Sequence, residues 1–325
     1  MKRKYLITGG AGFIGSHLIS RVIDDAEIIC VDNFDDFYPK SIKENNIKEH
    51  LKHPNYKLYK TDITNLSELR KIFENHEITH IVHLAANAGV RPSLLNPIKY
   101  VQTNITGTVN LLELSKEFGI KKFIFGSSSS VYGSRENGPF SEEMKIDKPI
   151  SPYASTKAAG EQFCYTYSHL YGLSIVCLRF FTVYGPGQRP DLAIHKFAKL
   201  INEGKPIPVF GDGTTKRDYT FIDDILQGVT ASIDYDKTPF EVINLGESNT
   251  VELNYLISLL EQNLNKKAII EKYPMQPGDV PITYADISKA KRVLGYNPTT
   301  PIEKGLVSFT EWFNNYYKSK MNVNT

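Results

Sequence analysis

The first half of the chain alternates short apolar runs with longer segments that have helical periodicity. Six of these runs are rich in β-forming residues and apolar on both faces, which predicts buried strands. Strands of this kind separated by helical segments are typical of a parallel sheet covered by helices. The predicted strands are Tyr5 to Thr8, Ile28 to Val31, Lys57 to Tyr59, His80 to Leu84, Lys122 to Phe125 and Ile175 to Arg179.

Two longer stretches carry apolar residues at the spacing of an amphipathic helix. The first runs from Asn104 to Phe118 and the second from Tyr153 to Tyr171. After Gly185, clusters of glycine and proline recur and predict a loop-rich second lobe. Together the patterns predict an α/β fold, a Rossmann-type doubly wound parallel sheet with a smaller C-terminal α/β substrate lobe.

The charges of the chain are nearly balanced, with 38 lysines and arginines against 36 aspartates and glutamates. The basic residues are scattered and form no polybasic run, which argues against nucleic acid or an anionic membrane as the partner. No apolar run approaches the ~20 residues that a membrane helix needs. We therefore expect a soluble, cytoplasmic protein whose partner is a small molecule.

The cysteines and histidines show no disulfide or metal-binding pattern. Cys30, Cys164 and Cys177 each lie singly inside an apolar stretch, so we expect buried thiols in a reducing compartment. The eight histidines form no cluster with ligand spacing, and no metal is predicted. His195 lies near the expected substrate loop, and we expect it at the surface.

A glycine-rich turn follows the first predicted strand and opens a helix. Gly9, Gly12 and Gly15 permit a tight turn, close approach of the backbone to a pyrophosphate, and close packing of the helix on the strand. Asp32 ends the second strand, 17 residues after Gly15, where a carboxylate can bind both ribose hydroxyls and repel a 2′-phosphate. The pattern predicts binding of NAD in preference to NADP, with a plain surface turn as the alternative.

Other residues at the same strand ends are candidates for contact with the dinucleotide. Asp62 and Ile63 follow the third strand within reach of the adenine, and small residues end the fourth strand where a cofactor would pass. The cofactor-binding candidates from this region are Gly9, Gly12, Phe13, Ile14, Gly15, Asp32, Asn33, Asp62, Ile63, Leu84, Ala85 and Ala86.

Tyr153 and Lys157 are four residues apart in a predicted helix, which places both side chains on one face. Tyrosine is a weak base because its free pKa is about 10, but an adjacent ammonium favours the phenolate. The serines at 127 to 130 directly follow a predicted strand and offer a hydroxyl that can relay a proton to the tyrosine. The alternatives are an exposed i,i+4 pair and a serine-rich linker.

These motifs together resemble the extended short-chain dehydrogenase/reductase family over nearly the whole chain. More narrowly, four segments are similar to those of nucleotide-sugar 4-epimerases, namely His83 to Ala86, Arg179 to Pro186, Arg217 to Thr220 and Pro277 to Val280. The resemblance implies an NAD-dependent enzyme that inverts C4 of a UDP-sugar. It also implies a transient 4-keto intermediate, with hydride held by tightly bound NAD and returned to the other face of the sugar.

The resemblance implies roles for individual residues as well. Tyr153 would be the base, Ser128 the catalytic hydroxyl, and Lys157 the electrostatic support of the base and a contact of the nicotinamide ribose. Asn104 would help to hold the lysine, and Phe181 would lie near the nicotinamide. The implied substrate-binding residues are Ser128, Ser129, Tyr153, Thr182, Arg189, Arg217, Asp279 and Thr283.

The serine segment bears on the class of reaction. Related dehydratases and decarboxylases carry a carboxylic acid beside the catalytic hydroxyl, whereas this sequence has Ser129 and Ser130 there. Simple inversion at C4 is therefore favoured over 4,6-dehydration or decarboxylation of a nucleotide sugar. A non-catalytic NAD-binding regulator is the alternative of another class, and such a protein would be expected to lack the pair of Tyr153 and Lys157.

The sequence leaves the sugar open. Arg189 lies where similar UDP-glucuronate 4-epimerases use an arginine for the C6 carboxylate, although phosphate or Asp191 could be its partner instead. Thr283 is small enough to leave room for a 2-acetamido group. The pairs UDP-glucuronate/UDP-galacturonate and UDP-N-acetylglucosamine/UDP-N-acetylgalactosamine are favoured equally, ahead of UDP-glucose/UDP-galactose. Arg217 is the expected diphosphate clamp, and Gln276 stands where many epimerases carry a second arginine.

We expect two domains and a symmetric assembly. Residues 1–185, with a returning segment near 218–250, are assigned to the NAD-binding domain, and residues 186–217 and 251–325 to the nucleotide-sugar-binding lobe. The two predicted amphipathic helices resemble those that form a four-helix interface in this family, so a homodimer is expected.

Overall fold

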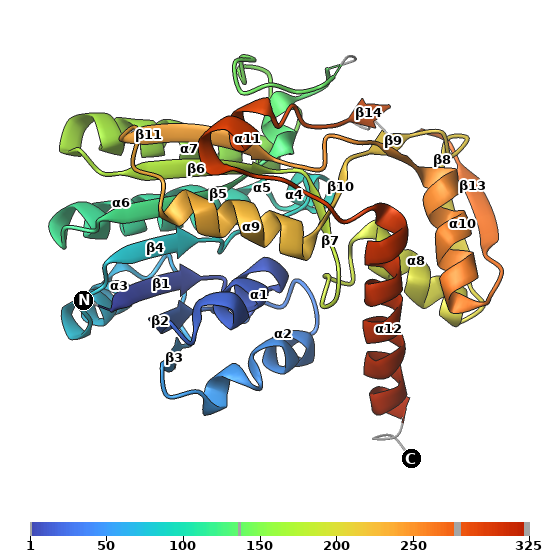
Figure 1. The fold of residues 1–325 in the computed structure, drawn as a ribbon, viewed down its shortest axis with the longest axis horizontal. Helices are drawn as coiled ribbons and strands as arrows, with labels where there is room; N and C mark the ends of the chain where they lie inside the picture. Colours follow the sequence, from blue (N-terminus) through green and yellow to red (C-terminus); the bar gives the residue numbers. More distant parts are fainter. Residues whose placement is uncertain (1, 136–137, 276–280, 322–325) are drawn as a thin grey trace.

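The computed structural model describes residues 2–135, 138–275 and 281–321. Its largest element is a seven-stranded parallel sheet with the order β11-β6-β5-β4-β1-β2-β3 (Figure 1). The strand order reverses between β1 and β4, and at such a switch point open α/β sheets bind ligands beyond the carboxyl ends of the strands. The predicted Rossmann-type fold is therefore confirmed. The strands are β1 (Arg3–Thr8), β2 (Ala26–Val31), β3 (Tyr56–Tyr59), β4 (His80–His83), β5 (Lys122–Ser128), β6 (Ile175–Phe180) and β11 (Phe240–Leu245).

Helices cover both faces of this sheet and build most of the second lobe (Figure 1). The α-helices are α1 (Phe13–Val22), α2 (Lys40–Ile47), α3 (Leu66–Asn75), α4 (Val90–Leu95), α5 (Pro97–Val101), α6 (Gly107–Glu117), α7 (Pro152–Tyr171), α8 (Ala193–Asn202), α9 (Ile222–Ile233), α10 (Leu253–Leu264), α11 (Ser288–Leu294) and α12 (Ile302–Met321). Three short helices of other types are η1 (His50–Lys52), η2 (Gln102–Thr106) and η3 (Ser129–Tyr132).

Alternation of side chains along the strands produces two separate cores. In β1, Ile7 belongs to the core that includes residues of α1 and α9, whereas its neighbour Leu6 belongs to the core with α3, α6 and α7. The sheet is thus buried on both faces, which explains why its strands are apolar throughout.

The two predicted helices differ in how well the sequence defines their ends. In α7 the Ser151 hydroxyl accepts a hydrogen bond from the Ala154 N–H (3.1 Å), Pro152 is the first residue, and Gly172 ends the helix with a left-handed φ of +69°. The stretch expected as one helix from 104 to 118 is divided, because η2 is a π-helical turn and α6 begins at Gly107.

The region after Gly185 is more regular than its glycine and proline content predicts. The helices α8 and α12 both pack against α10, on the side of the molecule away from the large sheet (Figure 1). Three small sheets complete the fold outside the large sheet. They pair β7 (Thr182–Tyr184) with β10 (Tyr219–Phe221), β9 (Lys216–Arg217) with β12 (Val251–Glu252) and β14 (Ile282–Thr283), and β8 (Pro206–Phe210) with β13 (Ile269–Tyr273).

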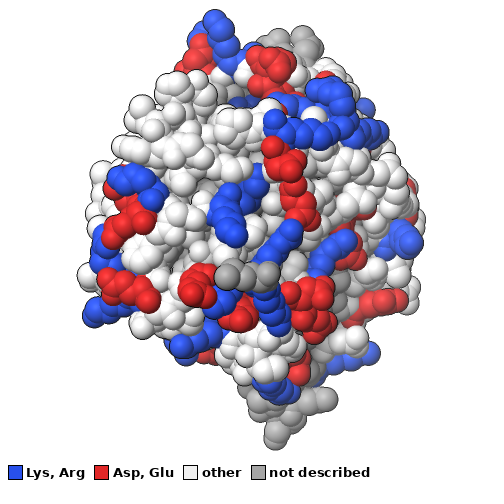
Figure 2. All heavy atoms as spheres, turned by 60° about the vertical axis from the view of Figure 1, so that its left-hand side comes forward, with Lys and Arg blue, Asp and Glu red and all other residues white. Residues whose placement is uncertain are grey.

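The surface and the cysteines agree with the composition. On the face drawn in Figure 2, lysines and arginines are interspersed with aspartates and glutamates. None of the helices in the described ranges is long and apolar enough to cross a membrane. Cys30, Cys164 and Cys177 are free and buried, which confirms their prediction as buried thiols. The described residues include no group of three or more His, Cys, Asp or Glu that could hold a metal ion.

Candidate active site

A cavity of about 890 Å³ lies beyond the carboxyl ends of the central strands, where residues following β1, β2, β4 and β5 line it. The sequence-predicted site residues that line this cavity are Gly9, Gly12, Phe13, Ile14, Gly15, Asp32, Asn33, Ile63, Leu84, Ala85, Ala86, Ser128, Ser129, Tyr153, Lys157, Phe181, Thr182, Arg189, Arg217 and Thr283. The fold thus brings together residues that are up to 274 positions apart, from Gly9 to Thr283.

The glycine-rich turn has no room for side chains at two of its positions. Gly9 has a φ of +70°, and a Cβ there would lie 2.7 Å from the backbone nitrogen of Ala85. A Cβ at Gly15 would lie 2.3 Å from the carbonyl oxygen of Gly9. Because α1 begins at Phe13, its N-terminal N–H groups lie beside this cavity, as a bound pyrophosphate requires.

Asp32 is placed where the sequence predicts a ribose-binding carboxylate. It directly follows β2, is 6% exposed, and accepts hydrogen bonds from the backbone N–H groups of Ala11 (3.0 Å) and Phe34 (2.8 Å). Burial raises the pKa of this carboxyl group, while the two N–H groups oppose that change. The glycine turn and this buried acid fit a dinucleotide that carries a free ribose 2′-hydroxyl.

Of three predicted site residues that are not found in the lining, two lie within the described ranges and one lies outside them. Asp62 accepts hydrogen bonds from Asn33 Nδ2 (2.7 Å) and from Thr64 Oγ1 (2.7 Å), so its carboxylate closes a local turn. Its neighbour Ile63 lines the cavity instead. Asp279 lies outside the described residues. The third residue is Asn104.

The predicted role of Asn104 in holding Lys157 stays a prediction, and the hydrogen bonds of Asn104 connect it to Lys157 through the backbone of α7. The Asn104 amide donates to the Thr156 hydroxyl (2.9 Å) and to the Asn87 carbonyl (2.9 Å), and its oxygen accepts from the Asn87 N–H (2.8 Å). Lys157 Nζ donates to the carbonyl of Gly126 at 2.6 Å. Asn104 therefore fixes the residue that precedes Lys157 in α7.

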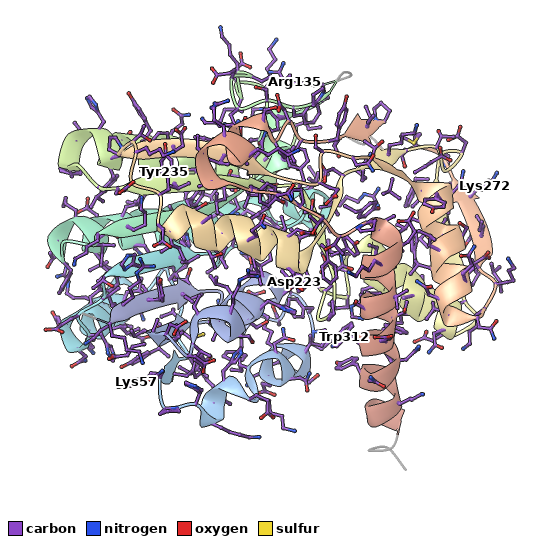
Figure 3. All side chains as sticks on the ribbon, viewed as in Figure 1. Lys57, Arg135, Asp223, Tyr235, Lys272 and Trp312 are labelled. Atoms are coloured by element: carbon purple, nitrogen blue, oxygen red, sulfur yellow. The ribbon has the colours of Figure 1, made fainter. Side chains whose placement is uncertain are left out.

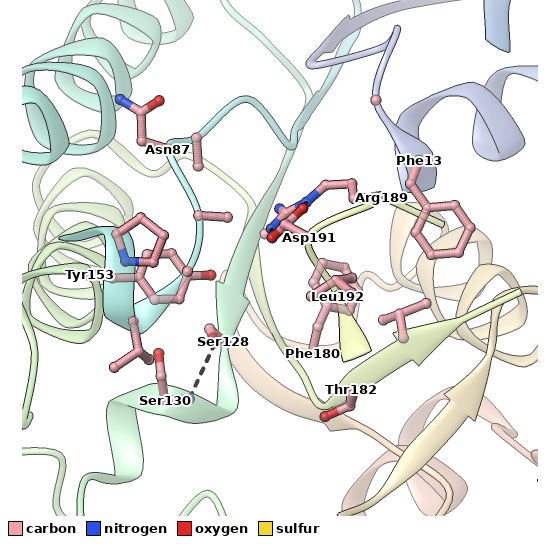
Figure 4. Close-up of a pocket in the computed structure, with 18 of the residues that line it drawn as sticks. Phe13, Asn87, Ser128, Ser130, Tyr153, Phe180, Thr182, Arg189, Asp191 and Leu192 are labelled. Carbon is pink, nitrogen blue, oxygen red and sulfur yellow. Dashed lines mark hydrogen bonds and ion pairs between the residues drawn. The ribbon is translucent and has the colours of Figure 1, made fainter. Parts of the chain in front are cut away.

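A hydroxyl, a phenol and an ammonium meet on one wall of the cavity. Tyr153 and Lys157 are four residues apart in α7 and so share one face of that helix. Ser128 ends β5 beside Tyr153 (Figure 4). The Ser128 hydroxyl is close enough to Tyr153 to lower its pKa, and its Oγ accepts a hydrogen bond from the Ser130 N–H (3.2 Å). Ser128 and Tyr153 can pass a proton between a bound hydroxyl and the phenol, and the buried ammonium of Lys157 lies on the same wall.

The electrostatics of this wall depend on burial. Burial raises the pKa of Tyr153, whereas the Ser128 hydroxyl and the positive charge of Arg189 act in the opposite direction. Burial also lowers the pKa of Lys157 to about 8. A positive charge bound next to Tyr153 would favour its phenolate further.

Arg189 lies on the opposite wall, in the loop between β7 and α8 (Figure 4). Its guanidinium forms a two-pronged ion pair with Asp191, with Nε–Oδ1 at 2.9 Å and Nη2–Oδ2 at 2.7 Å. It also lies over the Phe37 ring at 5.4 Å, and its side chain is 20% exposed. A cation is therefore held in place at the end of the cavity that contains Tyr153.

Two histidines fix the loop that carries Arg189. His17 of α1 hydrogen-bonds the Pro186 carbonyl (2.8 Å), and His195 of α8 hydrogen-bonds the Gln188 carbonyl (2.5 Å). The prediction that His195 lies at the surface is wrong, because it is fully buried. It packs against aromatic side chains of α12, among them Trp312, which is labelled in Figure 3.

Arg217 and Thr283 are neighbours in the small sheet of the second lobe. β9 and β14 pair in parallel with these two residues in register, and both line the cavity. The next residue, Asp218, is fully buried and accepts hydrogen bonds from the backbone N–H groups of Glu247 (2.7 Å) and Ala285 (3.0 Å). This acid ties the strand of Arg217 to the segment that follows Thr283.

Several lining residues have no signal of their own in the sequence. The guanidinium of Arg91 lies 4.6 Å from the centre of the Phe210 ring, so α4 and β8 meet across the cavity. Lys196 of α8 adds a further cation to the lining, and Ser130 adds a buried hydroxyl. The place of Arg91, shortly after the predicted fourth strand, is the only feature that could have indicated it.

Comparisons with known proteins identify the family of the chain. Residues 6–309 match the family model described as GDP-mannose 4,6 dehydratase. A UDP-glucuronate 4-epimerase of Thermodesulfobacterium geofontis is 48% identical over 310 residues, which cover 95% of each chain.

Two solved structures resemble the whole chain. UDP-glucuronic acid 4-epimerase from Bacillus cereus, in complex with UDP-glucuronic acid and NAD, has a TM-score of 0.90 and 39% identity, covering 97% of this chain and 100% of that one. UDP-N-acetylglucosamine 4-epimerase from Methanobrevibacter ruminantium, in complex with UDP-N-acetylmuramic acid, has a TM-score of 0.89 and 32% identity with the same coverage. The chain therefore belongs to the GDP-mannose 4,6-dehydratase family of extended short-chain dehydrogenases/reductases, and within it to the NAD-dependent UDP-sugar 4-epimerases.

Proposed function

We propose that this protein is a UDP-glucuronate 4-epimerase, which interconverts UDP-glucuronate and UDP-galacturonate. The observation that carries the proposal is the position of Arg189. Its guanidinium lines the cavity, and its charge acts on the Tyr153 phenol. The similarity to UDP-glucuronate 4-epimerases supports the same sugar.

The geometry of a hexose connects these two residues. The base must face the C4 hydroxyl, and C5, which bears C6, is the next ring carbon. We therefore assign the cation near Tyr153 to the end of the sugar that would carry a C6 carboxylate. Arginine suits that group because its planar fork binds a carboxylate through two parallel hydrogen bonds. Asp191 holds the same fork in the structure, so a substrate carboxylate would share or replace an existing ion pair.

The chemical step is assigned to Tyr153, Ser128 and Lys157. Bound NAD supplies the acceptor, and afterwards the donor, for the hydride of C4. Tyr153 takes the proton of the C4 hydroxyl as phenolate and returns it after inversion, and Ser128 hydrogen-bonds both that hydroxyl and the phenol. Lys157 favours the phenolate with its charge while its Nζ is anchored on the Gly126 carbonyl.

The polar groups near Tyr153 favour inversion over elimination. The carboxylates that line the cavity within the described residues are Asp32, Asp35 and Asp191. The first two lie at the cofactor end, and the third is paired with Arg189. Since the groups beside Ser128 are the hydroxyls of Ser129 and Ser130, a second acid for dehydration is missing from this wall.

We assign the binding of the substrate diphosphate to three cationic side chains of the cavity lining. Arg217 lies on β9 in the cavity lining, and Arg91 and Lys196 line the same cavity from α4 and α8. Gln276, which stands where many epimerases carry a second arginine, lies outside the described residues. We propose Arg217 as the principal diphosphate contact.

UDP-N-acetylglucosamine is the second candidate substrate, and Thr283 favours it. This small residue is in register with Arg217, so it lies toward the diphosphate end of the sugar, where C2 and its acetamido group would be. The similarity to UDP-N-acetylglucosamine 4-epimerase supports this reading too. UDP-glucose is the third candidate because it has neither a C6 carboxylate for Arg189 nor a 2-acetamido group for the space beside Thr283.

The experiment incubates the purified protein and NAD separately with UDP-glucuronate, UDP-N-acetylglucosamine and UDP-glucose, and follows the products by proton NMR. We expect UDP-galacturonate to form fastest, without net NADH and without carbon dioxide. Faster inversion of UDP-N-acetylglucosamine would reject the sugar and keep the reaction. A pentose or a 4-keto-6-deoxy product would reject the reaction class.

We also propose a homodimer, formed by the two helical stretches predicted from the sequence, now η2 with α6, and α7. The helices α6 and α7 pack against each other, and on α7 Phe163 is 37% exposed and Leu170 62%. Exposed apolar side chains of this kind mark an interaction surface. Light scattering should give twice the 36.8 kDa of one chain, and Phe163→Asp should give the monomer. A control change on another exposed helix residue, Val307→Asp, should leave the dimer intact.

We further propose the domain division and a cytoplasmic location. The pairing of β11 with β6 in the large sheet supports a first domain of residues 1–185 with a returning segment near 218–250. Residues 186–217 and 251–325 would then form the sugar-nucleotide lobe. Three free, buried cysteines support a reducing compartment.

A further inference from the structure

A buried ion pair lies close to Ser128 and Tyr153. Its two residues, and the serine that they contact, have no role in the reaction proposed above. Arg179 of β6 holds Glu161 of α7 through Nε–Oε1 at 2.9 Å and Nη2–Oε2 at 2.7 Å. Both side chains are less than 5% exposed. Ser127 of β5, itself 3% exposed, donates its hydroxyl to Glu161 Oε1 at 2.5 Å. One strand end and one helix are thus joined through the same carboxylate.

The ion pair also reaches the second lobe. Arg179 Nη1 donates to the hydroxyl of Tyr132 (3.0 Å), which donates to Asn244 Oδ1 (2.7 Å). Asn244 Nδ2 donates to the carbonyl of Phe140 (2.8 Å), and the Phe140 N–H donates to the carbonyl of Tyr284 (2.8 Å), the residue after Thr283. The side chains of Arg179, Tyr132, Asn244 and Phe140 are all buried.

The two ends that the ion pair joins are the ends that carry the proposed catalytic groups. Ser127 directly precedes Ser128, and both residues contribute to the cavity lining, but the Ser127 hydroxyl is directed to Glu161 of α7. Glu161 follows Lys157 by four residues and Tyr153 by eight, on the same face of α7. The Ser127–Glu161 hydrogen bond is therefore a direct link between the strand of Ser128 and the helix of Tyr153.

Stability alone is a weak reason for such a pair. Two charges taken out of water lose hydration that their attraction only partly restores, and replacing buried pairs by apolar residues is often neutral or stabilising. The geometry, in contrast, has a use at this place, since transfer of a proton requires donor and acceptor within hydrogen-bond distance. A displacement of about 1 Å can reduce a catalytic rate about 10²-fold.

We propose that Ser127 is a positioning residue, which, anchored on the Glu161–Arg179 pair, sets the placement of the Ser128 hydroxyl against the Tyr153 phenol. The inference rests on the roles proposed above for Ser128 and Tyr153, and it holds for any of the three sugars. Ser127 acts only through Ser128, so its effect must disappear when the Ser128 hydroxyl is absent.

The test uses Ser127→Ala, a change that removes one hydroxyl and leaves the ion pair complete. We expect kcat to fall about tenfold, with the KM for the UDP-sugar, the NAD content and the midpoint of thermal unfolding unchanged. Ser232→Ala is the matched control, because Ser232 is fully buried and its hydroxyl bonds only within α9, to the Gly228 carbonyl. This control should leave kcat unchanged.

The decisive measurement is a double-mutant cycle with Ser128→Ala. We expect Ser127→Ala to lower kcat in the wild type and to have no further effect in the Ser128→Ala background. A crystal structure of Ser127→Ala should show Ser128 Oγ displaced from Tyr153, which is a readout independent of turnover.

The outcomes separate the inference from the proposed function. If Ser128→Ala leaves kcat intact, the proposed role of Ser128 fails and the inference fails with it. If Ser128→Ala impairs the enzyme but Ser127→Ala does not, only the positioning role is rejected. Multiplying effects of the two changes, or a lower unfolding midpoint with kcat unchanged, would also reject the positioning role.

Discussion

Two walls of the cavity differ in how their side chains are held. Ser128, Tyr153 and Lys157 project from a strand of the large sheet and from a 20-residue helix, and Lys157 is only 5% exposed. Arg189 and Asp191 project from a loop, and their side chains are 20% and 31% exposed. The first wall is fixed by two cores and a buried ion pair, whereas the second is fixed mainly by contacts of its backbone.

The difference matches the chemistry that each wall serves. Transfer of a proton and a hydride requires fixed distances, so rigid elements suit the groups that perform it. A sugar that must present both faces to the same cofactor requires room and an anchor that acts away from C4. We expect changes on the first wall to stop the reaction and changes on the second to alter which sugar reacts.

The largest expected effect comes from Tyr153→Phe. Removing the phenolic hydroxyl should lower kcat about 10³-fold, because the proton of the C4 hydroxyl then has no base. Binding of UDP, measured by calorimetry, should be unchanged. Tyr165→Phe, an exposed position on the same helix, is the control and should retain full activity. Comparable activity of the two variants would contradict the assignment of the base.

The next effect tests the second wall through Arg189→Met. The ratio of kcat/KM for UDP-glucuronate to that for UDP-glucose should fall about 10²-fold, since a charge-assisted pair with the C6 carboxylate is lost. Asp191→Asn keeps the cation and should retain the preference for the acidic sugar. An equal loss for both substrates would mean that Arg189 serves the diphosphate, and the comparison between the walls would not hold.

A smaller effect is expected at the cofactor end. Asp32→Asn keeps the shape of the side chain but removes the charge that repels a 2′-phosphate, so the preference for NAD over NADP should fall about tenfold. The dissociation constants of both dinucleotides, measured by calorimetry, give this ratio. Asp35→Asn, also in the cavity lining, is the matched control. An unchanged preference in Asp32→Asn would move the discrimination to another residue.

The smallest effect on turnover, and a clear one on stability, is expected at His83. This histidine is 1% exposed between the hydroxyls of Thr8 (2.7 Å) and Thr108 (2.9 Å), and burial lowers its pKa to about 3. Between pH 6.5 and 3 the unfolded chain therefore binds about one proton more than the folded protein at this site. The free energy of unfolding should fall with decreasing pH across that window, by about 5 kcal/mol in total. Above pH 6.5 the contribution of neutral His83 to stability is fully present.

Denaturant unfolding at several pH values measures this contribution. In His83→Gln the slope between pH 3 and 6.5 should be smaller by about one proton. Gln162→Ala, at an exposed position without a titratable group, is the control and should keep the wild-type slope. An unchanged slope in His83→Gln would mean that His83 is not held neutral by burial.

The sequence predicted the first wall better than the second for physical reasons. Glycine spacing, strand alternation and a helical pair of Tyr153 and Lys157 are local patterns, because neighbours in the chain determine them. The second wall depends on β9, whose partners β12 and β14 come from residues 251 and 282 onward. Strands of two residues have no periodicity to detect, so their pairing could not be predicted.

One error has a specific cause. Histidine is a polar residue that is common at protein surfaces, so the sequence predicts His195 there. The aromatic side chains that bury it come from α12, more than 110 residues later. Long-range packing of this kind leaves no trace in the local pattern.

The loop from Gly185 to Asp191 is fastened at two carbonyls, by His17 and by His195, while the charged side chains lie between and beyond these points. The fastening uses backbone atoms, so it does not depend on which side chain stands at position 189. New specificity can therefore evolve by substitution within a seven-residue segment while hydride chemistry is inherited unchanged. Substitutions in this loop can change the substrate of the enzyme while the residues of the chemical step stay the same.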